Sequence, residues 1–183
     1  MILIIDFGSQ TAHLIGRRLR SLGVSVEYAD PEDALHSIKT NQPKGIILSG
    51  GPNDISHDAS LSVDKHIFSL GLPVLGICYG WQLMAHLLGG TVKHSKKEYG
   101  PEEIMFDNRM SIFALPKKKF SVIMSHGDTV TKLPKGFTAM GSTKQVRFAA
   151  VMSEKEKLFG VQFHPEADHT EHGTKLLQNF AID

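Results

Sequence analysis

The sequence has 183 residues, enough for one domain, 1–183, with a sizeable hydrophobic core. Lysine and arginine number 20 and aspartate and glutamate 19, so the net charge of +1 disfavours a general electrostatic nucleic-acid binder. A single cysteine excludes an internal disulfide and fits a reducing, cytoplasmic location, and no signal-peptide or membrane-spanning pattern is present.

The first half of the chain alternates short apolar runs with helical patterns. Such runs are typical of buried parallel strands, and alternation with helices predicts right-handed crossovers. The predicted strands are 1–6, 24–28, 45–52 and 72–77. The predicted helices are 9–23, 31–38, 60–71 and 79–90.

After residue 90 the strand-like runs follow one another with few helical patterns between them. They cover 102–106, 120–127, 137–142, 148–153 and 158–164, and a closing helix is predicted over 170–182. These runs either extend the sheet or form an antiparallel section beside it. We therefore expect an α/β fold with an open, mostly parallel sheet, flanked by helices and carrying some antiparallel strands in the second half.

The one cysteine, Cys78, lies where a predicted strand meets a predicted helix, with Gly76 and Gly80 two residues away on either side. A sharp strand-to-helix turn lifts a nucleophile off the sheet and leaves no room for bulky neighbours. The N-terminus of the following helix stabilises negative charge and offers N–H groups to an oxyanion. A buried structural cysteine is the alternative, but the spacing favours a nucleophile.

A general base for this thiol is available at His164, which follows another strand-like run, with Glu166 two residues later. A catalytic cysteine needs a partner that takes and returns its proton, and that partner needs an orienting group. Parallel strands place their carboxyl ends at one edge of the sheet, so distant residues can meet there. Considered by itself, His164 could instead be a structural histidine whose ring nitrogens form hydrogen bonds within a loop.

The sequence gives less support to a metal or cofactor site than to a catalytic cysteine. The "HPE" motif matches the H-x-E of zinc deaminases, but those enzymes need further cysteines that this chain lacks. The spacing of His164, His169 and His172 is not a standard zinc arrangement. The sequence contains neither a phosphate-binding loop nor a dinucleotide-binding fingerprint. The segment "SGGP" at 49–52 could bind an anion or an oxyanion through its backbone N–H groups, or it could form an ordinary tight turn. We predict neither a metal nor a cofactor in this chain.

The motifs "IIDFGSQ", "ILSGGP", "GICYGWQ", "MSHGD" and "GVQFHPE" together resemble the class I (triad) glutamine amidotransferase family, over nearly the whole chain and in the family's order. The resemblance implies a flavodoxin-like fold. Within the family, "DFGSQ", "MSHGD" and the residues His169, Thr170 and Gly173 are similar to the branch found in GMP synthetases.

The resemblance implies a role for each matching residue. Cys78 would attack the side-chain amide of glutamine and form a γ-glutamyl thioester, His164 would transfer the protons, and Glu166 would orient His164. The backbone N–H groups of Gly51 and Tyr79 would form the oxyanion hole. The implied glutamine-binding residues are Gln82, Ser125, Gly127 and Asp128.

The resemblance also implies a partner, an ATP-pyrophosphatase (synthetase) subunit that binds ATP and magnesium and converts XMP to GMP with the released ammonia. The start at Met1 and the closing helix favour a separate glutaminase subunit over an excised domain. Neither a nucleic acid nor a membrane is an expected partner. The alternatives are a stand-alone γ-glutamyl thiol hydrolase, the amidotransferase subunit of another synthase, and a regulatory module without activity.

Overall fold

The computed structural model describes residues 1–55, 61–107 and 109–182, without the side chain of Lys96. Its strands are β1 (Ile2–Ile5), β2 (Val26–Ala29), β3 (Gly45–Leu48), β4 (Val74–Ile77), β5 (Thr91–Phe106), β6 (Lys119–Lys132), β7 (Thr138–Ser142), β8 (Ala150–Ser153) and β9 (Leu158–Val161). Its α-helices are α1 (Thr11–Ser21), α2 (Ala34–Asn41), α3 (Tyr79–Leu87) and α4 (Gly173–Ile182). Three short 3-10 helices complete the described elements: η1 (Pro31–Asp33), η2 (Lys65–Ser69) and η3 (Ser111–Phe113).

All the described strands belong to one nine-stranded sheet with the order β2-β1-β3-β4-β9-β8-β7-β5-β6. The pairs from β2 to β9 are parallel, and the pairs from β9 to β6 are antiparallel. The mixed sheet confirms the predicted fold class. It also decides the open question about the second half, because the later strands continue the first sheet and make an antiparallel half of their own.

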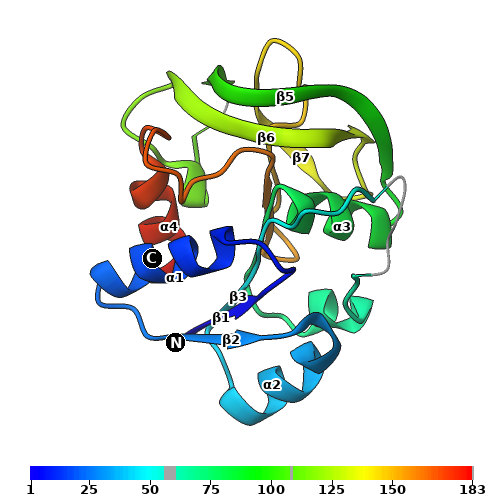
Figure 1. Cartoon of the computed structure of the whole chain (residues 1–183), viewed down its shortest axis with the longest axis vertical. Helices are drawn as coiled ribbons and strands as arrows, with labels where there is room; N and C mark the ends of the chain where they lie inside the picture. Colours follow the sequence, from blue (N-terminus) through cyan, green and yellow to red (C-terminus); the bar gives the residue numbers. More distant parts are fainter. Residues whose placement is uncertain (56–60, 108, 183) are drawn as a thin grey trace.

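Helices cover both sides of the sheet, with α1 and α4 together on one side and α2 and α3 on the other (Figure 1). Alternate residues of β1 face opposite sides, as the pleat of a strand requires, so Ile4 joins the core under α1 and α4 while Leu3 joins the core under α2 and α3. The predicted apolar face of the closing helix is confirmed, since Leu176, Leu177 and Phe180 are all buried.

The predicted helix over 60–71 is wrong for most of its length. Ser60 lies outside the described residues, and within the described part only the 3-10 helix η2 forms. Asp64 caps this short helix by accepting a hydrogen bond from the backbone N–H of His66 at 2.9 Å. Asp64 therefore starts the short helix only at Lys65, and Gly71, with φ of 74°, turns the chain toward β4 soon after it ends.

The sequence predicts only the end of the long strand β5, over 102–106, whereas the structure begins it at Thr91. The segment before residue 102 is polar, and Pro101 disfavours a central strand. Pairing with β6 along nearly its whole length forms the strand nevertheless. The two strands make a long curved ribbon at one end of the molecule (Figure 1).

Among the described residues, no helix has the length and apolar character needed to cross a membrane.

Candidate active site

The turn between β4 and α3 holds Cys78 in a strained backbone conformation, with φ of 50° and ψ of −108°. A β-carbon on Gly80 would lie 2.3 Å from the carbonyl oxygen of Leu48, and one on Gly76 would lie 2.7 Å from the backbone of Trp81. Both distances are shorter than real β-carbon contacts, so the flanking glycines are required by close backbone packing. Strain of this kind concentrates at functional sites.

His164 and Glu166 follow β9, which pairs in parallel with β4, the strand that precedes Cys78. The carboxyl ends of these neighbouring strands therefore bring the thiol and the imidazole to the same place. Nδ1 of His164 lies 2.8 Å from Oε1 of Glu166, and both side chains are buried. This contact directs the other ring nitrogen, Nε2, away from the carboxylate.

Burial by itself would lower the pKa of the His164 imidazole, but hydrogen-bonding and Coulomb interactions with Cys78 and Glu166 outweigh it and raise the pKa well above the usual value of 6.5. Nε2 of His164 nevertheless has no hydrogen bond of regular geometry in the described part of the chain. Thiol and imidazole are therefore close enough to interact, and catalytic hydrogen bonds are often long or poorly aligned in structures of this kind.

A threonine that the sequence connects only with the family resemblance fixes the backbone of His164. The hydroxyl of Thr170 donates to the carbonyl of His164 at 2.7 Å and accepts the backbone N–H of Ile123 in β6 at 3.0 Å. The N–H of His164 donates to the carbonyl of Ile123 at 3.0 Å. The base is therefore attached to β6 as well as to β9.

Gln162, which is buried two residues before His164, is a site residue that the sequence motifs alone do not single out. Its side-chain amide donates to Sγ of Cys78 at 3.6 Å and accepts from Nε2 of Gln82 at 3.3 Å. The thiol in turn donates to the backbone carbonyl of Ser125 at 3.4 Å. Polar residues at inward positions of an apolar run are the signal that marks Gln162 in the sequence.

A small cavity of about 140 Å³ opens beside the thiol. Its lining includes the predicted site residues Cys78, Gly51, Tyr79, Gln82, Ser125 and Gly127. His164 and Glu166 line a neighbouring hollow of about 210 Å³ that also includes Ser125. The structure therefore brings together eight of the nine predicted residues around Cys78, and Asp128 is the exception.

Two of the predicted glutamine-binding residues serve the framework of the site. Both N–H groups of the Gln82 amide are engaged, with the carbonyl of Asp128 at 2.8 Å and with Gln162. The side chain of Asp128 is fully buried and lies outside the cavity lining. Its carboxylate contacts Nδ1 of His94 at 3.2 Å. Contacts of these two side chains therefore attach the "SHGD" segment to α3 and β5.

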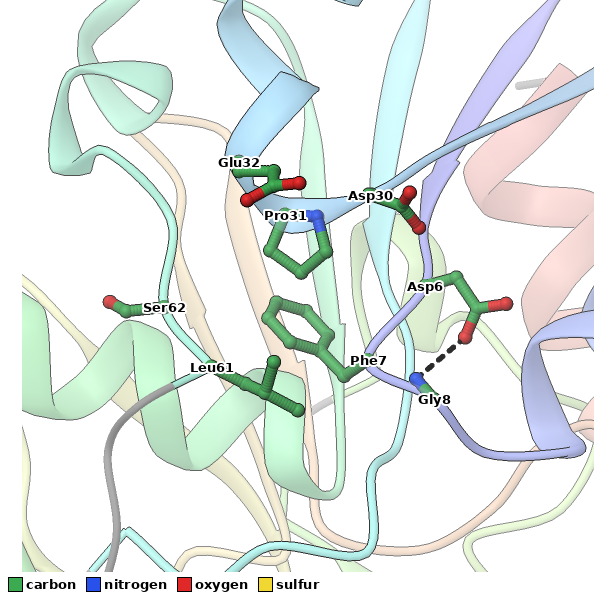
Figure 2. A pocket seen from close by; sticks show the side chains of 8 residues that line it. All are labelled: Asp6, Phe7, Gly8, Asp30, Pro31, Glu32, Leu61 and Ser62. Atoms are coloured by element: carbon green, nitrogen blue, oxygen red, sulfur yellow. Dashed lines mark hydrogen bonds between the residues drawn. The ribbon is translucent and has the colours of Figure 1, made fainter.

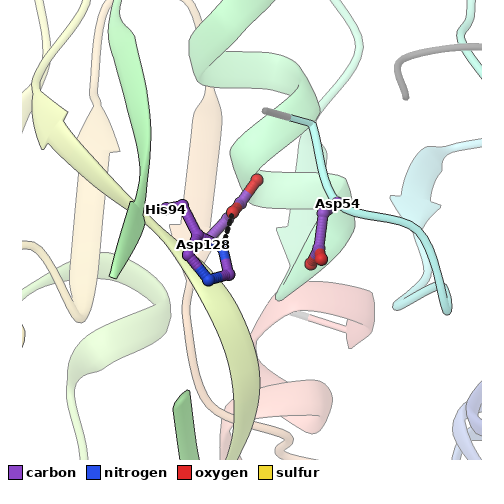
Figure 3. Close-up of side chains that lie close together, drawn as sticks. All are labelled: Asp54, His94 and Asp128. Atoms are coloured by element: carbon purple, nitrogen blue, oxygen red, sulfur yellow. Dashed lines mark hydrogen bonds and ion pairs between the residues drawn. The ribbon is translucent and has the colours of Figure 1, made fainter. Parts of the chain in front are cut away.

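Figure 3 shows Asp54, His94 and Asp128 close together next to this segment. One possible ligand atom from each lies within 4.8 Å of the others, and two carboxylates with an imidazole suit a divalent cation. The imidazole already contacts Asp128, however, and Asp54 lines the cavity of Cys78. We therefore assign the three residues to the framework beside that cavity, with Asp54 in its lining and His94 and Asp128 outside it.

The "DFGSQ" motif shapes a different hollow, of about 330 Å³, at the carboxyl end of β1 (Figure 2). Oδ1 of Asp6 accepts the N–H of Gly8 at 2.8 Å, and the ring of Phe7 faces Pro31. The N–H of Phe7 donates to Oγ of Ser49 at 3.1 Å. The motif therefore supports the neighbouring "SGGP" loop, and Cys78 is not part of the lining of this hollow.

Comparison with known proteins gives a concordant result. The family model described as "Glutamine amidotransferase class-I" matches residues 3–183. GMP synthase [glutamine-hydrolyzing] of Staphylococcus epidermidis is 46% identical over 181 residues, which are 98% of this chain and 35% of that protein. The corresponding enzyme of Lactococcus lactis subsp. cremoris is 45% identical over 183 residues, 100% of this chain and 36% of that protein. The chain thus spans about a third of the length of these curated relatives.

Solved structures agree with the sequence comparison. A candidate GMP synthase subunit from Thermoplasma acidophilum superposes with a TM-score of 0.89 at 30% identity and covers 98% of this chain and 91% of that one. A glutamine amidotransferase from Thermotoga maritima has a TM-score of 0.73 at 23% identity over 91% of this chain and 76% of its own, which supports the fold. By its family match and its near-complete overlap with the T. acidophilum structure, the chain belongs to the class-I glutamine amidotransferase family.

Proposed function

We propose that this chain forms one glutamine amidotransferase domain, 1–183, and hydrolyses glutamine to glutamate and ammonia through a γ-glutamyl thioester on Cys78. The observation that carries the proposal is the arrangement at two neighbouring strand ends. A strained turn presents Cys78, and the His164 imidazole, which contacts Glu166 at 2.8 Å, follows the neighbouring strand and interacts with the thiol. Thiol, base and orienting carboxylate are the parts that nucleophilic acyl transfer needs.

In the first half of the reaction, the Cys78 thiolate adds to the amide carbon while His164 holds the thiol proton. The carbonyl π electrons move to oxygen, and the backbone N–H groups of Gly51 and Tyr79 stabilise the resulting oxyanion. When the intermediate collapses, the C–N bond breaks and Nε2 of His164 gives its proton to the leaving nitrogen. Ammonia departs, and the glutamyl group remains on sulfur.

In the second half, a water molecule attacks the thioester and His164 removes its proton. The C–S bond breaks, glutamate leaves, and the Cys78 thiolate is again paired with the imidazolium of His164. The raised pKa of His164 suits the return of the proton in the first half, since a histidine that holds its proton is a ready general acid. Glu166 stabilises that cation throughout.

The small cavity next to Cys78 is the proposed glutamine site. Main-chain groups of Ser125 and Gly127 would hold the α-amino and α-carboxylate groups, and the contact of Gln82 with the carbonyl of Asp128 would keep this segment in place. A cavity of about 140 Å³ suits the side chain of a single small amino acid, with the α-substituents at its opening. This is smaller than the usual range of drug-sized ligand sites, about 300–1,000 Å³.

We further propose that the ammonia is used by an ATP-pyrophosphatase partner that converts XMP to GMP, with ATP and magnesium bound on that partner. The support is the name of the relatives, GMP synthase [glutamine-hydrolyzing], together with the share of their length that this chain matches. A reducing cytoplasm is the proposed location, because the mechanism needs Cys78 as a free thiol.

Ammonia release from glutamine by the purified chain with its synthetase partner tests the proposal. Cys78→Ala and His164→Ala are expected to abolish release, whereas the exposed residue His13, substituted as His13→Ala, is expected to keep the wild-type rate. Unchanged release by Cys78→Ala would exclude the thioester route.

A further inference from the structure

A second histidine-carboxylate pair lies beside the cavity and has no part in the mechanism above. Nε2 of His126 lies 2.9 Å from Oε2 of Glu98, and the two side chains are 1% and 5% exposed. The residues face each other across the β5–β6 ladder. His126 also lines the cavity of Cys78.

The other ring nitrogen of His126 defines the protonation of this pair. Nδ1 lies 2.9 Å from the carbonyl oxygen of Asp128, which can only accept, so Nδ1 carries a hydrogen. Nε2 would then present a lone pair to the Glu98 carboxylate at 2.9 Å unless a proton lies between them. The contact is therefore favourable when one proton lies between Glu98 and His126 and unfavourable when it does not.

Such a pair costs desolvation that its attraction barely repays, so a buried ion pair contributes little net stability. The cost is higher here because neither Glu98 oxygen nor Nε2 of His126 has a regular hydrogen bond in the described part of the chain. What the pair does provide is orientation, because Nδ1 of His126 contacts the carbonyl oxygen of Asp128 at 2.9 Å and Nε2 contacts the Glu98 carboxylate at 2.9 Å. That fixes the backbone on either side of the ring, at Ser125 and Gly127.

The β5–β6 ladder is irregular at this place and needs fixing. Between the aligned pairs His94–Asp128 and Glu98–His126, β5 has three residues where β6 has only Gly127. The hydroxyl of Ser95 donates to the carbonyl of Gly127 at 3.3 Å. Side-chain pairs therefore lie on both sides of a bulge in β5. The segment of β6 opposite this bulge contains the main-chain groups that we propose bind glutamine.

We propose that Glu98 is a positioning residue that acts through His126 to hold the main chain of 125–128 in its glutamine-binding form. The proposal rests on the proposed function, since it names what sets glutamine affinity at that site. Glu98 touches neither the thiol nor the cavity. Cys78 and His164 follow β4 and β9, and Sγ of Cys78 contacts the 125–128 segment at the carbonyl of Ser125 alone, so the loss of Glu98 should change glutamine affinity more than it changes thiol reactivity.

The test measures alkylation of Cys78 by iodoacetamide in the purified chain, with increasing glutamine as protectant. Glu98→Leu removes the partner of Nε2, whereas Glu98→Gln keeps it, because an amide N–H donates to a neutral imidazole. The matched control is Glu103→Leu, which removes an exposed ion pair with Lys119 in the same two strands.

For Glu98→Leu we expect the half-protecting glutamine concentration to rise about tenfold, because Nε2 of His126 loses its buried polar partner and the main chain of 125–128 loses an attachment to β5. The alkylation rate without glutamine should stay within about twofold, and Glu98→Gln and the control should stay near wild type. If Glu98→Leu fails to fold, His126→Asn replaces it, because asparagine keeps the donor to Asp128 and loses the contact with Glu98.

Unchanged protection in Glu98→Leu, or in His126→Asn where that variant replaces it, would overturn the inference. A second result would also overturn it. If Glu98→Leu lowers glutamine affinity, thiol reactivity and thermal stability together, and Glu98→Gln does not restore them, Glu98 has a structural role only. Absence of protection in the wild type would instead contradict the proposed function, so the two failures are distinguishable.

Discussion

Nδ1 of His164 lies 2.8 Å from Oε1 of Glu166, and the two residues are 7% and 2% exposed. The contact fixes the ring so that Nε2 serves the thiol, and it supplies the negative charge that stabilises the imidazolium. The "HPE" motif therefore places Nε2 of His164, and not Nδ1, as the ring nitrogen that would exchange a proton with the thiol.

Glu166→Gln should lower kcat for glutamine hydrolysis by roughly 10²–10⁴-fold, the range of a general base that has lost its orienting group. The amide keeps the size of the side chain but removes the charge that favours the imidazolium. Cys78→Ala should leave no detectable release, since it removes the nucleophile itself. Steady-state ammonia assays compare the two, and a Glu166→Gln enzyme with wild-type kcat would contradict the orienting role.

The stability of the folded chain should depend on pH through His164. Its pKa in the folded state is raised above the usual 6.5 by Cys78 and Glu166 against the opposing effect of burial. The contribution is therefore fully present below about pH 6.5 and is lost as pH rises through the folded-state pKa. Between the two pKa values, the free energy of unfolding should fall by up to about 1.4 kcal/mol per pH unit.

Denaturant unfolding at a series of pH values measures this dependence. His164→Gln should remove this part of the slope, whereas His13→Gln, at an exposed position in α1, should keep it. Parallel slopes for wild type and His164→Gln would show that His164 carries no raised pKa in the folded state.

Gly80→Ala should destabilise the fold by about 1–3 kcal/mol or more, the usual cost of overpacking. Its new methyl group would lie 2.3 Å from the backbone oxygen of Leu48, which cannot move without shifting β3. His86→Ala, an exposed substitution in the same helix, provides the control and should stay within about 0.5 kcal/mol of wild type. Thermal unfolding measures both, and a Gly80→Ala variant as stable as wild type would contradict the packing argument.

Thr170→Val should reduce stability by about 1–3 kcal/mol, because a buried carbonyl and a backbone N–H lose the hydroxyl that joins them. It should also lower kcat, since the backbone of His164 loses an attachment to β6. Thr170→Ser keeps the hydroxyl and should restore both properties. If valine and serine variants behave alike, the hydroxyl bridge has no role in placing the base.

Glutamine hydrolysis by the chain alone should be slow and should increase when an ATP-pyrophosphatase partner docks. Nε2 of His164 has no hydrogen bond of regular geometry in the described part of the chain, and enzymes often complete such geometry on conformational closure. Ammonia release with and without the partner measures the effect. Equal rates would contradict coupling between the two sites.

Local sequence patterns predict the parallel half of the sheet and the position of the triad. A buried strand is short and uniformly apolar, and both Cys78 and His164 follow such a strand, so the sequence alone places them at the same sheet edge. The glycines around Cys78 are also visible in the sequence, because their spacing about the cysteine marks the turn even though one packing partner of Gly80, Leu48, lies on the neighbouring strand β3.

The wall of the site is harder to predict because it depends on long-range pairing. The polar segment 91–101 becomes a strand only by pairing with β6, and the Glu98–His126 contact exists only in that register. Asp128 shows the same limit. Its motif places it in the glutamine site, but the partner that its buried carboxylate contacts, His94, lies 34 residues away.

The most direct test of the thioester route is to treat the protein with an electrophilic glutamine analogue and to locate the adduct by peptide mass mapping. The mechanism predicts one modified residue, Cys78, with labelling prevented by glutamine and absent in Cys78→Ser. An adduct on another residue, or an unmodified Cys78 in a protein whose glutamine hydrolysis the analogue has stopped, would contradict it.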